Sequence, residues 1–306
     1  MKIFFDKEAI KGKYEKMMTD QFHHIDFVSD IQGNTDAEAI ISMPGFLKPE
    51  NLDLFKQLKW VHLLTAGYDQ INLEYYLNRN IVLTNAKDVF SIQIAEDIFS
   101  KILYFDRNIK KHIHHMSNGL WQYEKVQFDI AHSTVGIIGC GSIGFEIAKR
   151  MKAFDAHIIG YKRSFEAVPY FDEIYTDQIG LTKLYEESDY IVVSLPLTKE
   201  TYHMIDERTF SLMKENAVII NVARGDIIDQ EALIKALKNK QIRAAGLDVM
   251  SPEPLPSDHE LWHLENVLIT PHNASSSPYF NQRLIRQAIE TIKSYIAKQE
   301  LDNRIV

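Results

Sequence analysis

The stretch TVGIIGCGSIGFEIAKRM, Thr134–Met151, decides the fold of this chain. It runs from a β-branched strand pattern, through glycines spaced G-x-G-x-x-G, into an amphipathic helical pattern. The first glycine permits a tight turn, the second lets a pyrophosphate approach the backbone, and the third lets helix and strand pack closely. The amino end of the helix would offer N–H donors to the phosphates. The pattern predicts a dinucleotide-binding unit, against the alternative of a glycine-rich turn in another α/β sheet. The loop residues assigned to the cofactor are Gly139, Gly141, Ser142, Ile143 and Gly144.

The end of the next strand carries cations where such a unit usually has an acid. An NAD-specific unit places Asp or Glu about 20 residues past the glycines, to accept from the ribose 2′-OH. Here Lys162, Arg163 and Ser164 occupy that strand end. Two cations and a hydroxyl would hold a 2′-phosphate through charge-assisted hydrogen bonds. The segment therefore favours NADP(H), with NAD(H) as the other cofactor considered. The alternative is a solvated loop in which Glu166 serves as the ribose-binding acid.

Strand-like and helical patterns alternate on both sides of the glycine loop, which predicts parallel sheets with helices on their faces. The fold class is α/β, with two doubly wound domains and a ligand cleft between them. The expected strands lie within 2–5, 25–28, 38–43, 60–64, 80–85, 134–139, 157–161, 190–196, 217–223, 243–249 and 266–271. Helical spacing covers 7–18, 50–58, 279–299 and one long helix over 92–115.

Composition narrows the class of protein. The chain has 306 residues, 45% hydrophobic and 25% charged, which is typical of a globular protein with two domains. Its net charge of -8 argues against a nucleic-acid partner or an anionic membrane. The absence of a signal-peptide core or a run of about 20 apolar residues, and a single cysteine, predict a cytoplasmic protein. That cysteine, Cys140, is expected to fill space under the glycine loop, although a helix N-terminus could also activate a thiol.

Three further stretches follow the glycine loop along the chain, in this order: NVARGDIIDQEAL (221–233), GLDVMSPEPLP (246–256) and LITPHNASSS (268–277). Together with LLTAGYDQINL, GCGSIG, VSLPLTKET and LMKENAVIINVARG, they resemble the D-isomer specific 2-hydroxyacid dehydrogenase family over nearly the whole chain. The resemblance implies a flavodoxin-like substrate-binding domain at 1–97 plus 275–306, and a Rossmann NAD(P)-binding domain at 98–274. It also implies a homodimer, with contacts around Trp121 and the helix before it.

The resemblance assigns a catalytic triad. Arg224 in NVARG matches the arginine that grips the substrate carboxylate, because a guanidinium offers a planar two-pronged match. His272 in TPHNA matches the acid/base that gives a proton to the carbonyl oxygen during reduction. Glu253 in SPEPLP matches the carboxylate that orients this imidazole and favours its charged form. Taken singly, each is more often a loop or turn residue, and only the ordered set carries the assignment.

The remaining site residues also come from the resemblance. The backbone amides of Ala66 and Gly67 are expected to meet the substrate carboxylate, beside Tyr68, where the family commonly has a small aliphatic residue. Asp248 is placed near the nicotinamide carboxamide. The other residues assigned to the cofactor are Leu195, Pro196, Thr201, Val222 and Ala223. Asp155 and Asp226 are taken as turn acids, and the histidines at 23, 24, 112, 114 and 115 as solvated residues without a metal.

These assignments predict an NADPH-dependent reductase of small 2-oxo acids, of the glyoxylate or hydroxypyruvate class, that yields D-2-hydroxy acids. An NAD-linked D-lactate or phosphoglycerate-type dehydrogenase is one alternative. A non-catalytic dinucleotide-sensing scaffold is another, although the triad argues against it. Formate dehydrogenase is disfavoured, because its motif carries Gln where Glu253 stands.

Overall fold

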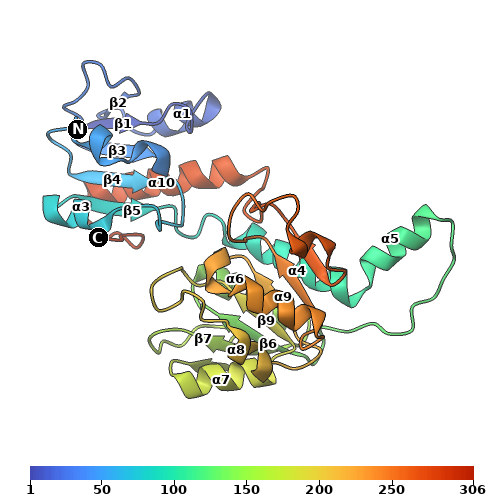
Figure 1. Ribbon diagram of the computed structural model, residues 1–306. Coiled ribbons are helices and arrows are strands. Elements are labelled where there is room, and N and C mark those ends of the chain that lie inside the picture. Colours follow the sequence, from blue (N-terminus) through green and yellow to red (C-terminus); the bar gives the residue numbers. More distant parts are fainter. The chain divides into compact units, whose positions relative to one another are not determined.

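The computed structural model describes all 306 residues, which divide into two compact units. Residues 1–90 and 277–306 form the first unit, and residues 91–276 form the second (Figure 1). Each unit contains one sheet in which every neighbouring pair of strands is parallel. The expected α/β class with two doubly wound sheets is confirmed. The division of substrate and cofactor binding at residues 97/98 and 274/275 stays a prediction.

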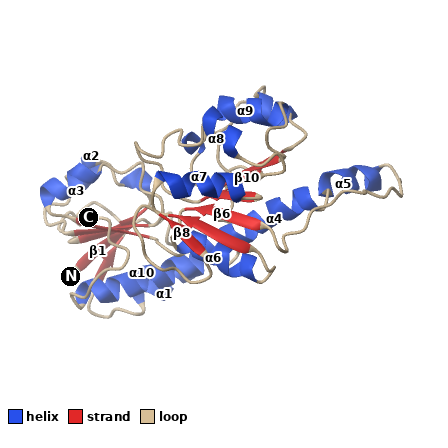
Figure 2. Ribbon diagram, turned by 90° about the horizontal axis from the view of Figure 1, so that it is seen from below, coloured by secondary structure: helices blue, strands red, loops and turns tan.

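The first unit has the strand order β2-β1-β3-β4-β5, which is the flavodoxin-like order. All residues of its central strands β3 and β4 are buried, as expected where helices cover both faces of a parallel sheet. In Figure 2, α1 and α10 lie on one side of this sheet, and α2 and α3 lie on the other. The elements are β1 (Lys2–Phe5), α1 (Lys13–Thr19), β2 (Asp26–Val28), β3 (Ala39–Ser42), η1 (Pro44–Phe46), α2 (Pro49–Leu52), β4 (Trp60–Leu63), α3 (Leu73–Arg79), β5 (Val82–Asn85) and α10 (Phe280–Ile296).

The C-terminal helix α10 completes the first unit although it lies far from β4 and β5 in sequence. Its Tyr295 ring stacks on Trp60, with 4.4 Å between ring centroids. The side-chain amide of Gln287 donates to the carbonyl of Asn85 at 3.1 Å. After the helix, the backbone N–H of Ile305 donates to the carbonyl of Leu83 at 2.8 Å. The last residues thus cover the free edge of β5.

The second unit has the strand order β12-β11-β10-β9-β6-β7-β8. Strand β6 lies between β7 and β9, so the order reverses there, and such a reversal is where open α/β sheets bind ligands. In Figure 2, α7, α8 and α9 lie on one face of this sheet, and α4 and α6 lie on the other. The elements are α4 (Ser91–Asp106), α5 (Ile109–Ser117), β6 (Thr134–Ile138), α6 (Ser142–Lys152), β7 (His157–Tyr161), β8 (Glu173–Tyr175), α7 (Gln178–Glu187), β9 (Tyr190–Val193), α8 (Glu207–Leu212), β10 (Val218–Asn221), η2 (Gly225–Ile227), α9 (Gln230–Lys238), β11 (Ala244–Leu247), η3 (Glu260–His263) and β12 (Val267–Ile269).

The single long helix expected over 92–115 is wrong. Two helices replace it, α4 and α5, because Asn108 adopts a left-handed conformation with φ 49°. Asparagine tolerates this conformation better than most residues, and its side-chain amide donates to the carbonyl of Val126 at 2.7 Å. Tertiary contacts therefore outweigh the apolar periodicity at this point. Figure 1 shows α5 and the chain after it as an arm projecting from the rest of the second unit.

Two other expected helices are shorter than their patterns. The helix expected from residue 7 begins only at Lys13, because Gly12 has φ 61° and ψ -126°, outside the helical region. The helix expected over 50–58 ends at Leu52. Leu52 and Phe55 are both buried and have helical spacing, yet Phe55 is reached by a turn in which its N–H donates to the Leu52 carbonyl.

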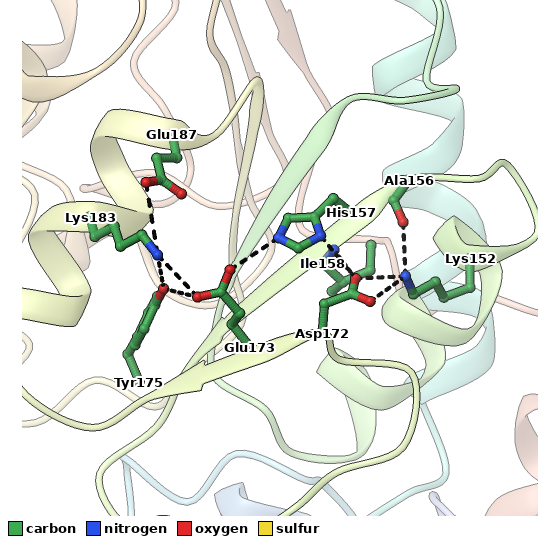
Figure 3. Close-up of polar contacts among 9 residues, drawn as sticks. All are labelled: Lys152, Ala156, His157, Ile158, Asp172, Glu173, Tyr175, Lys183 and Glu187. Atoms are coloured by element: carbon green, nitrogen blue, oxygen red, sulfur yellow. Dashed lines mark hydrogen bonds and ion pairs between the residues drawn. The ribbon is translucent and has the colours of Figure 1, made fainter.

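Strand β8 at the sheet edge was not expected, because its three residues carry no recognisable period. A polar network connects it to its neighbours (Figure 3). The carboxylate of Glu173 lies 3.3 Å from Nε2 of His157 and accepts from Lys183 at 3.0 Å. Beside it, Asp172 accepts the backbone N–H of Ile158 at 2.7 Å. Burial raises the pKa of Asp172, but this hydrogen bond and Lys152 outweigh burial and leave that pKa lowered. Side-chain pairing therefore fixes an edge that the apolar pattern did not predict.

Candidate functional site

The glycine loop joins β6 to α6 with the geometry that a dinucleotide needs. Gly139 has φ 110°, and a Cβ there would lie 2.8 Å from the Ser194 backbone. A Cβ on Gly144 would lie 2.2 Å from the Gly139 carbonyl oxygen. A Cβ on Gly141 would meet no atom within 4 Å. The outer two glycines are thus required by packing, while the middle one faces open space.

The amino end of α6 is available to an anion. Gly141 is its N-cap residue, and no side chain caps the helix. Free N–H groups at a helix start, combined with a partial positive charge, suit a phosphate. Because Gly141 leaves room beside them, the residues present fit a pyrophosphate. Ser142 and Ile143 form the first turn of this helix.

A second loop meets the glycine loop where the strand order reverses. The Ser194 hydroxyl, just after β9, donates to the Gly139 carbonyl at 3.0 Å. Leu195 is partly buried against the core of this unit. The hydroxyl of Thr201, a residue assigned to the cofactor, donates to the Pro196 carbonyl at 2.8 Å. Thr201 therefore closes this loop upon itself, while contact of Leu195, Pro196 and Thr201 with a cofactor stays a prediction.

The basic segment follows β7 directly. The backbone N–H of Lys162 donates to the Tyr175 carbonyl at 3.0 Å, which fixes the segment beside β8. The Lys162 ammonium lies 2.8 Å from the carboxylate of Glu166. Lys162, expected to hold a 2′-phosphate, and Glu166, the alternative ribose-binding acid, thus form an ion pair with each other. Arg163 and Ser164 follow in an exposed bend.

Cys140 is not arranged as a nucleophile. Its side chain is 5% exposed, and burial raises the pKa of the thiol to about 12. A Cβ on Gly160 would lie 2.5 Å from its sulfur. The thiol therefore fills the space between the glycine loop and β7.

No group of three or more His, Cys, Asp or Glu side chains is placed to hold a metal ion, and no helix is long and apolar enough to cross a bilayer.

Arg224 lies on a tightly constrained turn after β10. The Asn221 side chain, 1% exposed, accepts the Ala223 N–H at 3.0 Å and donates to the Arg224 carbonyl at 2.9 Å. Asn221 was not predicted from the sequence, and its only signal was a polar residue at the end of a buried strand. A Cβ on Gly225 would lie 2.1 Å from the Met250 backbone. The Arg-Gly pair therefore packs against the chain that leads to Glu253. Val222 and Ala223 are buried.

Glu253 and His272 face each other. Nδ1 of His272 lies 2.7 Å from one carboxylate oxygen of Glu253. The other carboxylate oxygen accepts the backbone N–H of Met250 at 3.0 Å. The His272 side chain is 47% exposed, so solvent or a ligand can reach the ring. Because Nδ1 meets the carboxylate, Nε2 is the nitrogen that can serve a substrate.

Asp248 shapes the loop that carries His272. It is 2% exposed, and its carboxylate accepts the backbone N–H groups of Asn273 at 3.0 Å and Ala274 at 2.9 Å. Its carbonyl accepts the N–H of His272 at 2.8 Å. His272 has φ 50°, an uncommon backbone conformation that such bonds can stabilise. The structure thus connects Asp248 to the histidine loop, while contact with a nicotinamide stays a prediction.

The candidate substrate residues of the first unit follow β4. The Thr65 hydroxyl donates to the Gly67 carbonyl at 2.8 Å, and the Asn85 amide donates to the Ala66 carbonyl at 2.6 Å. Both carbonyls therefore already have a hydrogen-bond partner, which leaves the backbone amides as the groups to consider for a ligand. Tyr68 packs partly buried against the core of this unit.

Comparisons with known proteins agree with this geometry. Residues 99–274 match the family described as D-isomer specific 2-hydroxyacid dehydrogenase, NAD binding domain. The chain is 34% identical over 268 residues to a glyoxylate reductase of Korarchaeum cryptofilum, a match that covers 85% of this chain and 80% of that relative. It is 33% identical over 276 residues to a D-3-phosphoglycerate dehydrogenase of Methanocaldococcus jannaschii, with 88% and 51% covered.

A solved structure extends the similarity to the whole fold. The structure of an acyclic imino acid reductase (Bsp5) in complex with NADPH and D-Arg has a TM-score of 0.85 to this chain. The two are 26% identical in sequence, and the match covers 100% of both chains. With its glycine loop, its paired Glu253 and His272 and these similarities, the chain belongs to the D-isomer specific 2-hydroxyacid dehydrogenase family of NAD(P)-dependent oxidoreductases.

Proposed function

We propose that this protein reduces small 2-oxo acids of the glyoxylate or hydroxypyruvate class to D-2-hydroxy acids, with NADPH as its preferred reductant. One observation carries the proposal: an acid/base pair, Glu253 and His272, 2.7 Å apart in the same unit as an open glycine loop. A fold kept only to sense a dinucleotide has no use for such a pair. The glyoxylate reductase relatives support the substrate class.

The proposed chemistry assigns one task to each side chain. When bound, a reduced nicotinamide would supply a hydride for the carbonyl carbon. His272 donates a proton from Nε2 to the carbonyl oxygen as negative charge develops there. Glu253 holds the ring in place through Nδ1. Reduction thus consumes one hydride and one proton, and in reverse the neutral ring takes the proton back.

Arg224 is proposed to anchor the substrate. A guanidinium binds a carboxylate through two parallel hydrogen bonds and can also polarise the adjacent 2-oxo group. The rigid turn made by Asn221 and Gly225 supports this role, because a bidentate contact requires a fixed backbone. The backbone amides of Ala66 and Gly67 are proposed as further donors to the substrate carboxylate. Asp248 is proposed to serve the nicotinamide carboxamide as well as the histidine loop.

The preference for NADPH rests on Lys162, Arg163 and Ser164 at the end of β7, where an NAD-specific unit has an acid. An NADPH complex of a similar fold is compatible with it. An NAD-linked D-lactate or phosphoglycerate-type dehydrogenase is the second candidate function, and the D-3-phosphoglycerate dehydrogenase relative is the observation that favours it.

A homodimer is proposed through the arm formed by α5 and residues 118–126. Trp121 is 105% exposed, which is unusual for so large an apolar residue. Its exposed apolar neighbours on the arm are Ile113, Met116, Leu120, Tyr123 and Val126. At the base of the arm, the Arg243 guanidinium lies 3.9 Å from the centroid of the Phe128 ring. The exposed apolar residues of the arm suit a contact with a second copy of the chain. A cytoplasmic location is proposed on the single cysteine, which needs no oxidising compartment.

Initial rates over a panel of 2-oxo acids, with NADPH and NADH side by side, test the function. The panel contains glyoxylate, hydroxypyruvate, pyruvate and 3-phosphohydroxypyruvate. We expect the highest kcat/KM for glyoxylate or hydroxypyruvate with NADPH. A preference for pyruvate or 3-phosphohydroxypyruvate with NADH would favour the second candidate. Binding of NADPH without oxidation by any acid of the panel would support the scaffold instead.

A further inference from the structure

The ion pair between Lys162 and Glu166 brings a carboxylate to the place where a 2′-phosphate is expected. The Lys162 ammonium and the Glu166 carboxylate are 2.8 Å apart. The Lys162 side chain is 18% exposed and the Glu166 side chain is 76% exposed. The lysine is thus packed against the protein, while the acid reaches it from solvent.

Lys162 is fixed close to the glycine loop. The carbonyl of Tyr161, the preceding residue, accepts the backbone N–H of Gly139 at 2.9 Å. Lys162 is also the charged residue whose proximity acts on the Cys140 thiol, where it opposes the larger effect of burial on the pKa. A cofactor lying on the glycine loop would therefore approach this ammonium and the carboxylate paired with it.

The neighbouring cation also has an acidic counterpart. Glu200 lies in the loop after β9, and its carboxylate accepts the Thr198 hydroxyl at 2.7 Å. The pKa of Glu200 is lowered, first by this hydrogen bond and to a smaller degree by Lys199 and Arg163. Arg163 is therefore within electrostatic range of Glu200. The positive charges of Lys162 and Arg163 are thus each partly balanced by a nearby carboxylate.

We propose that Glu166 sets cofactor selectivity by competing with the 2′-phosphate of NADP(H) for Lys162. This inference rests on the proposed function, whose cofactor it concerns. A phosphate monoester carries about 1.5 to 2 negative charges at neutral pH, so it is repelled by a carboxylate held at the same ammonium. The exposed Glu166 side chain must turn away before the phosphate can bind. A cofactor without the 2′-phosphate leaves the pair intact.

The competition has a definite consequence for selectivity. Because the Lys162–Glu166 pair must open before the 2′-phosphate can bind, the pair weakens NADP(H) binding and leaves NAD(H) binding nearly unchanged. Glu166 therefore narrows the difference in affinity between the two cofactors. A neutral residue at position 166 would widen that difference. Exposed ion pairs are worth little in water, but the doubly charged phosphate enlarges the effect. We expect the removal of the carboxylate to change 2′-phosphate affinity by about 3- to 10-fold.

Calorimetric titration with two cofactor fragments tests the proposed competition by binding alone, without measuring catalysis. The full chain is titrated with 2′,5′-ADP, which carries the 2′-phosphate, and with 5′-ADP, which lacks it. Glu166→Gln should tighten 2′,5′-ADP by about 3- to 10-fold and change 5′-ADP by less than about 2-fold. Glu186→Gln, on an exposed acid of α7, removes the same charge elsewhere and should leave both dissociation constants unchanged. Thermal melting of each variant checks that it is folded.

The double variant Lys162→Met with Glu166→Gln shows whether Glu166 acts by competing for Lys162 or only through the general effect of its negative charge on a nearby phosphate. In the Lys162→Met background, the gain from Glu166→Gln should fall below about 2-fold, because the contested cation is gone. A gain that persists there overturns the competition. So does a single Glu166→Gln variant that binds 2′,5′-ADP no more tightly than the unmodified chain. If the unmodified chain binds neither fragment, the cofactor site and the proposed function are wrong as well. Binding of both fragments with an unchanged ratio in Glu166→Gln refutes only this inference.

Discussion

The carboxylate of Glu253 bridges His272 and the backbone of Met250: one oxygen lies 2.7 Å from Nδ1 of His272, and the other accepts the Met250 N–H. Both oxygens of the acid are therefore engaged, and the acid is held still. The imidazole is fixed through one nitrogen only. This asymmetry leaves Nε2 as the nitrogen that can exchange a proton with a substrate.

Replacement of that imidazole tests its place in the chemistry. His272→Gln should lower kcat for 2-oxo acid reduction by about 10²- to 10⁴-fold, the usual worth of a positioned proton donor. The KM for NADPH should change little, because the glycine loop is untouched. His263→Gln, at an exposed histidine of η3, is the matched control and should keep the original rate. A kcat that survives His272→Gln would remove this residue from the proposed mechanism.

The shape of the guanidinium, and not only its charge, should matter at position 224. Arg224→Lys keeps the charge but loses the planar pair of donors. The KM for glyoxylate should rise by about 10- to 100-fold, since a charge-assisted bidentate contact is lost. Arg208→Lys on the exposed face of α8 provides the control. Steady-state kinetics decide the matter, and an unchanged KM in Arg224→Lys contradicts the anchoring role.

Removal of both cations at the end of β7 should act on one cofactor only. Lys162→Met combined with Arg163→Ala should raise the KM for NADPH by about 10-fold or more, because charge-assisted contacts to the 2′-phosphate disappear. The KM for NADH serves as the internal control and should change by less than about 3-fold. Equal increases for the two cofactors would show that neither side chain meets the 2′-phosphate.

The exposed arm predicts a change in assembly. Trp121→Lys places a charge in the centre of the proposed contact, so light scattering coupled to size exclusion should show a shift from dimer toward monomer at micromolar concentration. Ile179→Lys, at a residue of α7 that is 82% exposed, tests whether any exposed apolar residue has this effect and should leave the mass unchanged. A chain that is monomeric before any substitution refutes the dimer outright.

A buried histidine predicts how stability depends on pH. His62 is completely buried, and burial lowers its pKa to about 4, although Gln287 opposes this. Its folded pKa lies below its unfolded value of 6.5, so the unfolded chain binds the extra proton. The stability that the neutral ring contributes is therefore present above pH 6.5 and is lost as the pH falls toward 4. The loss attributable to this residue between pH 7 and pH 5 should be roughly 2 kcal/mol.

Urea unfolding at pH 7 and pH 5 measures this loss. The variant His62→Gln cannot titrate, so its stability should fall less between the two pH values than that of the unmodified chain. The comparison is made within each protein, which removes any constant cost of the substitution itself. An identical pH dependence in both proteins would show that His62 does not carry the effect.

The sequence predicts the regular parts of this fold well. The β-branched runs around β6, β7 and β9 and the glycine spacing leave little freedom, because a strand, a turn and a helix are each specified locally. The break at Asn108 was not predictable, because it depends on a hydrogen bond to Val126 that only the folded chain creates. Strand β8 was missed for the same reason, since side-chain pairing across the edge fixes it rather than apolar alternation.

The candidate site shows the same division. Glu253 and His272 are separated in sequence and were connected only through a family resemblance, yet the structure places them within hydrogen-bond distance. Asn221, which fixes the turn of Arg224, was overlooked because a lone asparagine at a strand end has many uses. The pairing of Lys162 with Glu166 was not predicted either, because the two residues stood only as alternatives, a phosphate-binding cation or a ribose-binding acid.

Residues 277–306 belong to the same unit as residues 1–90, and this has a consequence for folding during translation. Helix α10 packs on a sheet whose strands were all made before residue 91, while everything from 91 to 276 belongs to the other unit. During translation the inserted unit can complete its core while the five-stranded sheet still lacks one of its covering helices. Domains generally fold as units as they emerge from the ribosome, so here the part encoded first is expected to be the last to become stable.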